Sequence, residues 1–185
     1  MSLDLNDLVR RLKPDKDRTQ LHPRRDETLR ATDAIPLGRV RIVPDTNVYI
    51  NDAADLLSTD VEGLFDRSEK FHCSVCLAEL TAGIGAFDPG SARWATVNRH
   101  YTALFSTIPP HRILVPDADI WAAAGMISGM LARTQGFDRS NRMRCLNDTL
   151  ILLTAAKAGL PVLTADGDDF DLIQQTAGTG VFFYY

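Results

Sequence analysis

Apolar and polar positions alternate along this chain in short blocks, and the blocks predict strands and helices in turn. Strands are expected at about 41–44, 71–75 and 112–115, within 146–170, and at 180–185. Helices are expected after Asn47, at about 61–68, and from about 77 to 83 or 85. Further helices are expected from about 88–91 to about 106, from 117 or 119 through 132, and from Asp148 onwards. Strands that alternate with helices are typical of a parallel sheet with right-handed crossovers, so the pattern predicts an α/β fold.

Length and composition agree with a single folded domain. A chain of 185 residues with 45% hydrophobic residues can bury a full core. The longest apolar runs fall far short of the roughly 18 residues that a membrane span needs, and the charged first residues do not resemble a signal peptide. Three cysteines, an odd number, suit a reducing compartment. We therefore expect a cytoplasmic protein with no membrane segment.

Four carboxylates stand at or just beyond the ends of predicted strands: Asp45, Glu79, Asp148 and Asp166. In open α/β sheets, ligands bind outside the carboxyl ends of the strands. Each residue also has an ordinary interpretation, because Asp45 or Asp148 could simply cap a helix and Glu79 could be solvated. Their shared position at one edge of a sheet favours a site for divalent metal instead.

Three motifs in a fixed order carry a resemblance to a known family. The first is the apolar strand that ends in Asp45-Thr46-Asn47, and the second is the tripeptide Ala78-Glu79-Leu80. The third is Asn147-Asp148 with its apolar helix, followed by LTADGDDF at 163–170. Over about 39–185 the sequence resembles the PIN-domain metal-dependent ribonucleases, most closely the VapC-like toxins of type II toxin-antitoxin pairs.

The resemblance implies a three-layer α/β/α fold with a mostly parallel central sheet of four to five strands. It also implies an endoribonuclease that hydrolyses RNA phosphodiester bonds with Mg²⁺, for which Mn²⁺ can substitute. The expected partners are an RNA substrate, a cognate antitoxin protein and a second copy of the chain in a homodimer. Two divalent ions about 3.5 to 4 Å apart would activate the attacking water and neutralise the phosphate.

Roles follow for individual residues. Asp45, Glu79, Asp148 and Asp166 are the expected catalytic metal ligands, although Asp168 and Asp169 compete with Asp166, and Asp169 is the preferred substitute. Asp168 and Asp171 are otherwise interpreted as solvated turn charges. The expected donors that orient the carboxylates are Thr46, Asn47 and Thr164. The expected RNA-binding residues are Arg139, Arg142 and Arg144, in a polar segment that we interpret as a mobile rim loop before Asp148.

Charge and composition leave several alternatives to weigh. Residues 1–39 carry nine basic and seven acidic residues, a net charge of +2. The remainder carries eleven basic and seventeen acidic residues, a net charge of −6, so the total is −4.

A non-catalytic PIN-type module that binds RNA or protein remains an alternative. A phosphatase with an Asp nucleophile would need a second Asp where Asn47 stands. A zinc site at Cys73 and Cys76 would need a second pair, but only Cys145 remains.

The first 38 residues do not share the alternation of strands and helices. Leu3, Leu5, Leu8 and Leu12 predict one short amphipathic helix, and the stretch at 13–30 is polar and contains two prolines. We expect residues 1–38 to form a partly flexible N-terminal arm and residues 39–185 to form the PIN domain. The arm is interpreted as a mobile tail or packing arm, or alternatively as a contact with a partner subunit or RNA.

Overall fold

A parallel four-stranded sheet forms the middle of the fold. The computed structural model describes residues 4–24, 32, 35 and 38–185. The sheet has the order β2-β1-β5-β6, and every pair in it is parallel. Its strands are β1 (Arg41–Pro44), β2 (Glu69–Lys70), β5 (Val162–Thr164) and β6 (Phe182–Tyr184). A second parallel ladder joins β3 (His72–Cys73) to β4 (Ile113–Leu114).

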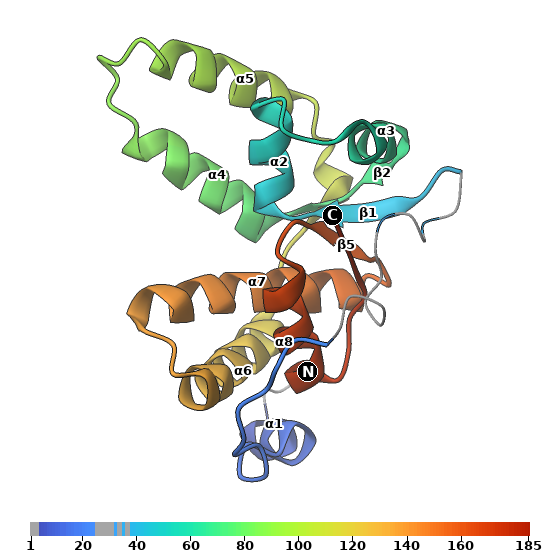
Figure 1. Ribbon diagram of the computed structural model, residues 1–185, viewed down its shortest axis with the longest axis vertical. Helices are drawn as coiled ribbons and strands as arrows, with labels where there is room; N and C mark the ends of the chain where they lie inside the picture. The colour runs from blue at the N-terminus through green and yellow to red at the C-terminus, as the bar shows by residue number, and fades with distance from the viewer. Residues whose placement is uncertain (1–3, 25–31, 33–34, 36–37) are drawn as a thin grey trace.

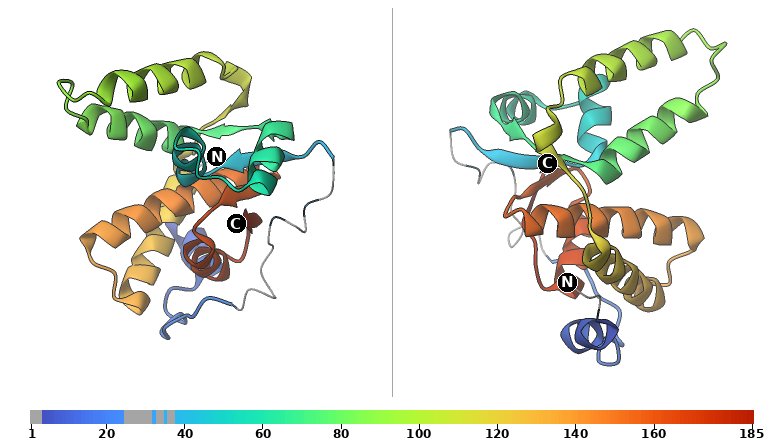
Figure 2. Two further views of the ribbon diagram at one scale, coloured as in Figure 1. Left: turned by 45° about the horizontal axis from the view of Figure 1, so that its top comes forward. Right: turned by 180° about the vertical axis from the view of Figure 1, so that it is seen from behind.

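Helices cover both faces of the sheet (Figure 1). One layer holds α2 (Thr46–Ala53), α3 (Thr59–Arg67), α4 (Ser74–Ala86) and α5 (Trp94–Ser106). The other layer holds α6 (Ala118–Gln135), α7 (Arg139–Lys157) and α8 (Gly167–Ala177). A short 3₁₀ helix, η3 (Pro110–Arg112), leads into β4. Figure 2 shows α4 and α5 projecting from the body as a pair. The predicted three-layer α/β/α fold with a mostly parallel sheet is confirmed.

The core lies where the inner strands meet α7. Ile42 and Val43 of β1 and Val162 and Leu163 of β5 have no exposed surface. Parallel strands covered on both faces are apolar along their whole length, which explains why these short runs do not alternate with polar residues. Gly180 lies against the same helix with a φ of 96°, and a Cβ there would stand 2.8 Å from Leu152. Only glycine fits this approach without strain.

Two helix starts differ from the expectation. The predicted start at Asp148 and the mobile rim loop before it are wrong, because α7 begins at Arg139. Gly136 ends α6 in the left-handed conformation, and the Asp138 side chain then caps α7 by accepting from the Asn141 amide at 2.8 Å. The first turns of α7 face solvent, so their polar sequence hides the helix. Glu79 lies on the second turn of α4 rather than the first.

The described part of the N-terminal arm packs on α6 and α8. Helix α1 (Leu5–Leu12) confirms the short predicted helix, although Leu3 lies outside the described residues. The Arg133 side chain donates to two arm carbonyls, Pro14 O at 2.8 Å and Asp17 O at 2.7 Å. Arg24 pairs with Asp171 of α8, which has no exposed surface, so the interpretation of Asp171 as a solvated charge is wrong. The division at residue 38 stays a prediction.

Among the described residues, no helix combines the length and apolar character that crossing a bilayer requires.

Candidate active site

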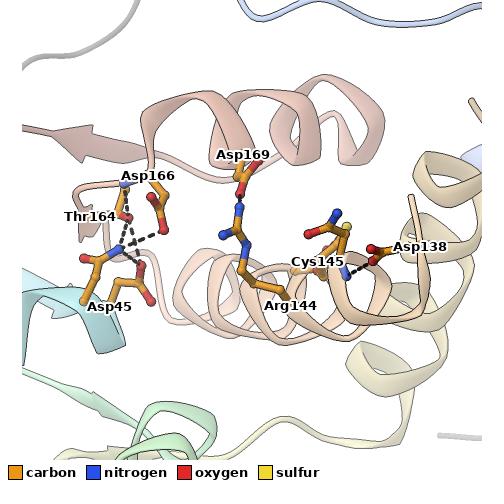
Figure 3. A network of polar contacts seen from close by, with 10 residues as sticks. Asp45, Asp138, Arg144, Cys145, Thr164, Asp166 and Asp169 are labelled. Carbon is orange, nitrogen blue, oxygen red and sulfur yellow. Dashed lines mark hydrogen bonds and ion pairs between the residues drawn. The ribbon is translucent and has the colours of Figure 1, made fainter. Parts of the chain in front are cut away.

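Two of the four predicted carboxylates leave neighbouring inner strands at the same edge. Asp45 follows β1 and Asp166 follows β5, and these strands pair directly. The Asp45 amide donates to the Leu163 carbonyl at 2.9 Å, which extends the ladder to the point where the chain turns. The carboxyl ends of two adjacent parallel strands therefore place both side chains beside each other, as Figure 3 shows.

The other two carboxylates reach this edge from helices that contact each other, Glu79 from α4 and Asp148 from α7. The Asn147 amide donates to Glu79 Oε1 at 2.7 Å, and the Thr46 hydroxyl donates to Glu79 Oε2. Glu79 is thus linked both to the turn after Asp45 and to the residue before Asp148. The structure brings the four predicted residues into one neighbourhood.

Neutral donors separate and orient these carboxylates. Asp45 Oδ1 accepts from the Thr46 amide at 2.7 Å, and Oδ2 accepts from Asn47 Nδ2 at 2.7 Å and from the Thr164 hydroxyl at 2.8 Å. Asn47 Nδ2 also lies 3.3 Å from Asp166 Oδ2 (Figure 3). The three residues expected as orienting donors therefore all contact the predicted acidic set, and they fix the rotamer of Asp45.

Burial makes the negative charge of this cluster costly. Asp45 is 3% exposed, and its pKa is raised from 3.8 to about 7, mainly by desolvation and further by Glu79 and Asp166, against hydrogen bonds that lower it. Asp148 is also buried, and its pKa is raised well above the ordinary value by desolvation, then by Asp45, Asp169 and Glu79. Two neighbouring buried acids disfavour the doubly charged state unless a cation compensates them.

One buried oxygen of the cluster is a candidate ligand atom for such a cation. Asp148 Oδ2 is buried, and no described residue forms a hydrogen bond with it. Carboxylate and hydroxyl oxygens are the donors that Mg²⁺ and Mn²⁺ prefer. In the described part of the chain, no three His, Cys, Asp or Glu side chains are already arranged to hold a metal ion. The Thr and Asn donors form hydrogen bonds with the carboxylates in this arrangement.

Asp169, the proposed substitute for Asp166, already has an internal cation. It pairs with Arg144, whose pKa is raised chiefly by Asp169. Arg144 lies one helical turn before Asp148, on the same face of α7. Asp166 raises the pKa of Arg144 less than Asp169 does, and it shares the Asn47 donor with Asp45. This arrangement favours Asp166 over Asp169 as the fourth acidic residue. Asp166 and Asp168 are both exposed, and Asp166 is linked to Asp45 through Asn47.

The three predicted RNA-binding arginines do not share one location. At about 100° per residue, Arg144 shares the face of Asp148, whereas Arg139 and Arg142 lie on other faces of α7. All three are exposed. The structure therefore brings Arg144 to the acidic cluster and leaves the other two around the helix, where RNA contact stays a prediction.

Sequence reasoning missed two residues beside the site. Asn147 stands in the Asn-Asp motif but was given no role, although it holds Glu79. Tyr184 of β6 packs against the start of α8, where a Cβ on Gly167 would stand 3.1 Å from the ring. The glycine after Asp166 was the available signal, because a helix start that lacks a Cβ often marks a close approach.

Comparison with known proteins places this sequence in a family. The sequence model of the PIN domain matches residues 42–175, which is well over half of the chain. The chain belongs to the PIN domain family. The match begins at β1 and ends within α8, so it includes all four acidic residues of the site. A search of curated proteins finds no significant match.

Solved structures share the fold of this PIN domain at low sequence identity. A chain from VapBC2 of Rickettsia felis, bound to a DNA fragment from its promoter, is 15% identical with a TM-score of 0.54, covering 79% of this chain and 99% of that chain. A chain from FitAcB of Neisseria gonorrhoeae is 23% identical with a TM-score of 0.54, covering 77% and 96%. A chain from FitAB bound to an IR36 DNA fragment is 21% identical, with the same TM-score and coverages of 77% and 94%.

Proposed function

We propose that this PIN domain is a metal-dependent endoribonuclease that hydrolyses RNA phosphodiester bonds with Mg²⁺, for which Mn²⁺ can substitute. The observation that carries the proposal is the buried, unpartnered Oδ2 of Asp148 beside the buried carboxylate of Asp45. An uncompensated pair of this kind costs stability, and such costs concentrate at functional sites. Membership of the PIN domain family supports the same conclusion.

Each residue of the cluster has a distinct task in this proposal. Asp45 and Asp148 would hold the metal, with Glu79 and Asp166 completing the set. Bound divalent metal supplies an activated water and neutralises charge on the phosphate. Thr46, Asn47 and Thr164 keep the carboxylates oriented through the contacts described above. Arg144 holds a phosphate oxygen by a charge-assisted hydrogen bond.

The biological setting that we propose is a toxin-antitoxin pair, in which this chain is the toxin. Support comes from the resemblance of its three motifs to VapC-like toxins and from the fold shared with chains of VapBC2 and FitAB. Helix α5 has no fully buried residue along its 13 positions, and its Tyr101 and Phe105 are half-buried against the core. We propose a cognate antitoxin and a homodimer as the partners, and the cytoplasm as the location.

Cleavage of RNA by the purified chain tests the enzymatic proposal directly. Structured RNA is incubated with Mg²⁺, with Mn²⁺ and with EDTA, and the product ends are mapped. We expect internal cuts that require metal and leave 5′-phosphates. The exposed Asp168, converted to Asn, is a matched control that should cut like the unchanged chain. RNA binding without any cleavage under all three conditions would assign the chain to the non-catalytic alternative.

A further inference from the structure

A cavity lies next to the acidic cluster, among α6, α7 and α8. Its volume is about 150 Å³. The apolar part of its wall comes from α6, the turn after it, and α8, namely from Leu131, Phe137, Leu172 and Ile173. Leu131 and Ile173 are each 1% exposed, so this wall is part of the packed core rather than a loose surface.

The ion pair between Arg144 and Asp169 connects this cavity to the acidic cluster. Both residues line the 150 Å³ cavity, and both also line a more polar pocket of about 400 Å³ that contains Asp166 and Tyr184. Figure 3 shows the pair between Asp166 on one side and Cys145 on the other. A molecule with a phosphate at the acidic cluster could thus place its neighbouring group in the cavity.

The chemistry of the cavity suits a flat ring with polar edges. An apolar cavity of about 150 Å³ lined by Leu, Ile and Phe accepts a ring the size of benzene. At the rim, the amide of Asn141, the guanidinium of Arg144 and the carboxylate of Asp169 together offer donors and acceptors. Apolar faces with hydrogen-bonding edges are the features of a nucleobase, and unpaired bases in RNA are recognised in such pockets.

We propose that this cavity binds the base of an unpaired pyrimidine nucleotide next to the phosphate held at the acidic cluster. The volume of about 150 Å³ matches a single ring, whereas the fused rings of a purine would extend beyond it. The proposal rests on RNA being the substrate, and it deepens that proposal by giving the site a base preference. Asn141 is the residue that reads the edge of the base, since it lines the cavity from an exposed position on the first turn of α7.

Nucleosides test the cavity without depending on metal or cleavage. Uridine, cytidine and adenosine carry no phosphate and cannot be cut, and ligand-observed NMR with the full chain measures their affinities. We expect the pyrimidine nucleosides to bind at least about tenfold more tightly than adenosine, because apolar pockets discriminate size by tenfold or more. Equal affinity for adenosine, or no binding of any nucleoside, overturns the proposal.

Two adjacent substitutions localise the effect. Asn141→Phe places a ring over the cavity mouth and should weaken uridine binding about tenfold. Ser140→Phe adds the same ring at the neighbouring exposed position, which does not line the cavity, and should change binding by less than about twofold. Asn141→Ala removes only the polar group at the rim and should weaken uridine binding less than Asn141→Phe does. Equal effects of the two Phe variants, with melting temperatures unchanged, contradict the assignment.

The outcome is separable from that of the proposed nuclease activity. Selective binding of pyrimidine nucleosides without RNA cleavage would support the base pocket and contradict the proposed nuclease activity. Metal-dependent cleavage of RNA without any preference among nucleosides would support the activity and contradict the base pocket. With an active enzyme, cuts in a mixed-sequence RNA should cluster beside pyrimidines, and Asn141→Phe should spread them.

Discussion

Two buried carboxylates lie on the neighbouring helices α7 and α8, and their surroundings differ. Asp171 on α8 has no exposed surface, and both of its oxygens are bonded. Oδ2 accepts from the Arg24 amide at 2.7 Å and from Gln175 at 2.8 Å, and Oδ1 accepts from Arg24 Nε at 2.6 Å. Asp148 on α7 is 6% exposed, and its Oδ2 has no hydrogen-bond partner among the described residues.

The difference separates a structural acid from a functional one. Burial alone does not distinguish them, because Asp171 is the more deeply buried of the two. The distinguishing property is compensation: Arg24 neutralises Asp171 and thereby fixes the N-terminal arm on α8. At the acidic cluster, Asp45 raises the pKa of Asp148, and the chain's own donors near Asp45 are neutral. A bound cation would supply there what Arg24 supplies to Asp171.

The largest expected effect is on activity. Asp45→Asn and Asp148→Asn should each lower RNA cleavage more than about 100-fold, because even partners outside a metal's ligand set typically cost 10- to 100-fold. The amide keeps the size of the side chain but lacks the charge that holds metal. Asp171→Asn should retain activity in its folded fraction. Cleavage rates with Mn²⁺, normalised to the folded fraction, test this prediction. If the rate of Asp45→Asn is within about threefold of that of the unchanged chain, Asp45 does not belong to the catalytic set.

The pH dependence of stability should distinguish the two groups next. Without metal, folded Asp45 has a pKa of about 7 against an ordinary value of 3.8. Between these values the folded state keeps a proton that the unfolded state loses, so the free energy of unfolding falls as pH rises from about 4 to about 7, by at most ~4 kcal/mol for this group. Urea unfolding in EDTA across this range measures the fall. Asp45→Asn should flatten the curve, and an unchanged slope would contradict the account.

Removing the compensation of Asp171 should destabilise the fold. Arg24→Ala leaves a fully buried carboxylate without its cation, and we expect a loss of about 2 to 4 kcal/mol, since Arg24 itself is partly exposed. Arg24→Lys keeps the positive charge but loses the guanidinium hydrogen bonds to Asp171, so its free energy of unfolding should lie between those of the unchanged chain and Arg24→Ala. Urea unfolding at neutral pH gives the values. A loss below about 0.5 kcal/mol, the size of an ordinary surface substitution, would mean that the arm does not depend on this pair.

Arg144 should produce the smallest effect, on RNA binding alone. It resembles Arg24 in pairing with an acid, but its side chain is 59% exposed and remains available to phosphate. Arg144→Ala should reduce the slope of log affinity against log salt by roughly one unit, because one phosphate contact is lost. Arg142→Ala, on another face of α7, is the matched control and should change the slope less. Equal slopes for both variants would place the phosphate contact elsewhere.

Much of the site follows from local sequence. The β-branched run before Asp45 predicts β1, and the three motifs predict which carboxylates meet, because parallel strands end at one edge. The start of α7 was not predictable from polarity, since residues such as Arg139 and Arg142 face solvent on a helix as readily as in a loop. Asp171 was misread for a related reason: its partner, Arg24, stands far away in a polar arm. The base cavity depends on three helices packing together, which no local pattern encodes.

The most direct test of the metal site is a titration of Mn²⁺ followed by thermal unfolding. A cation that binds only the folded state raises the melting temperature by mass action, and a gain of about 1 kcal/mol corresponds to roughly 2–4 °C for a chain of this size. We predict a saturable rise of at least several degrees for the unchanged chain and for Asp168→Asn. Asp45→Asn and Asp148→Asn should show no rise. An equal rise in the unchanged chain and both of these variants would contradict a metal site at the buried carboxylates.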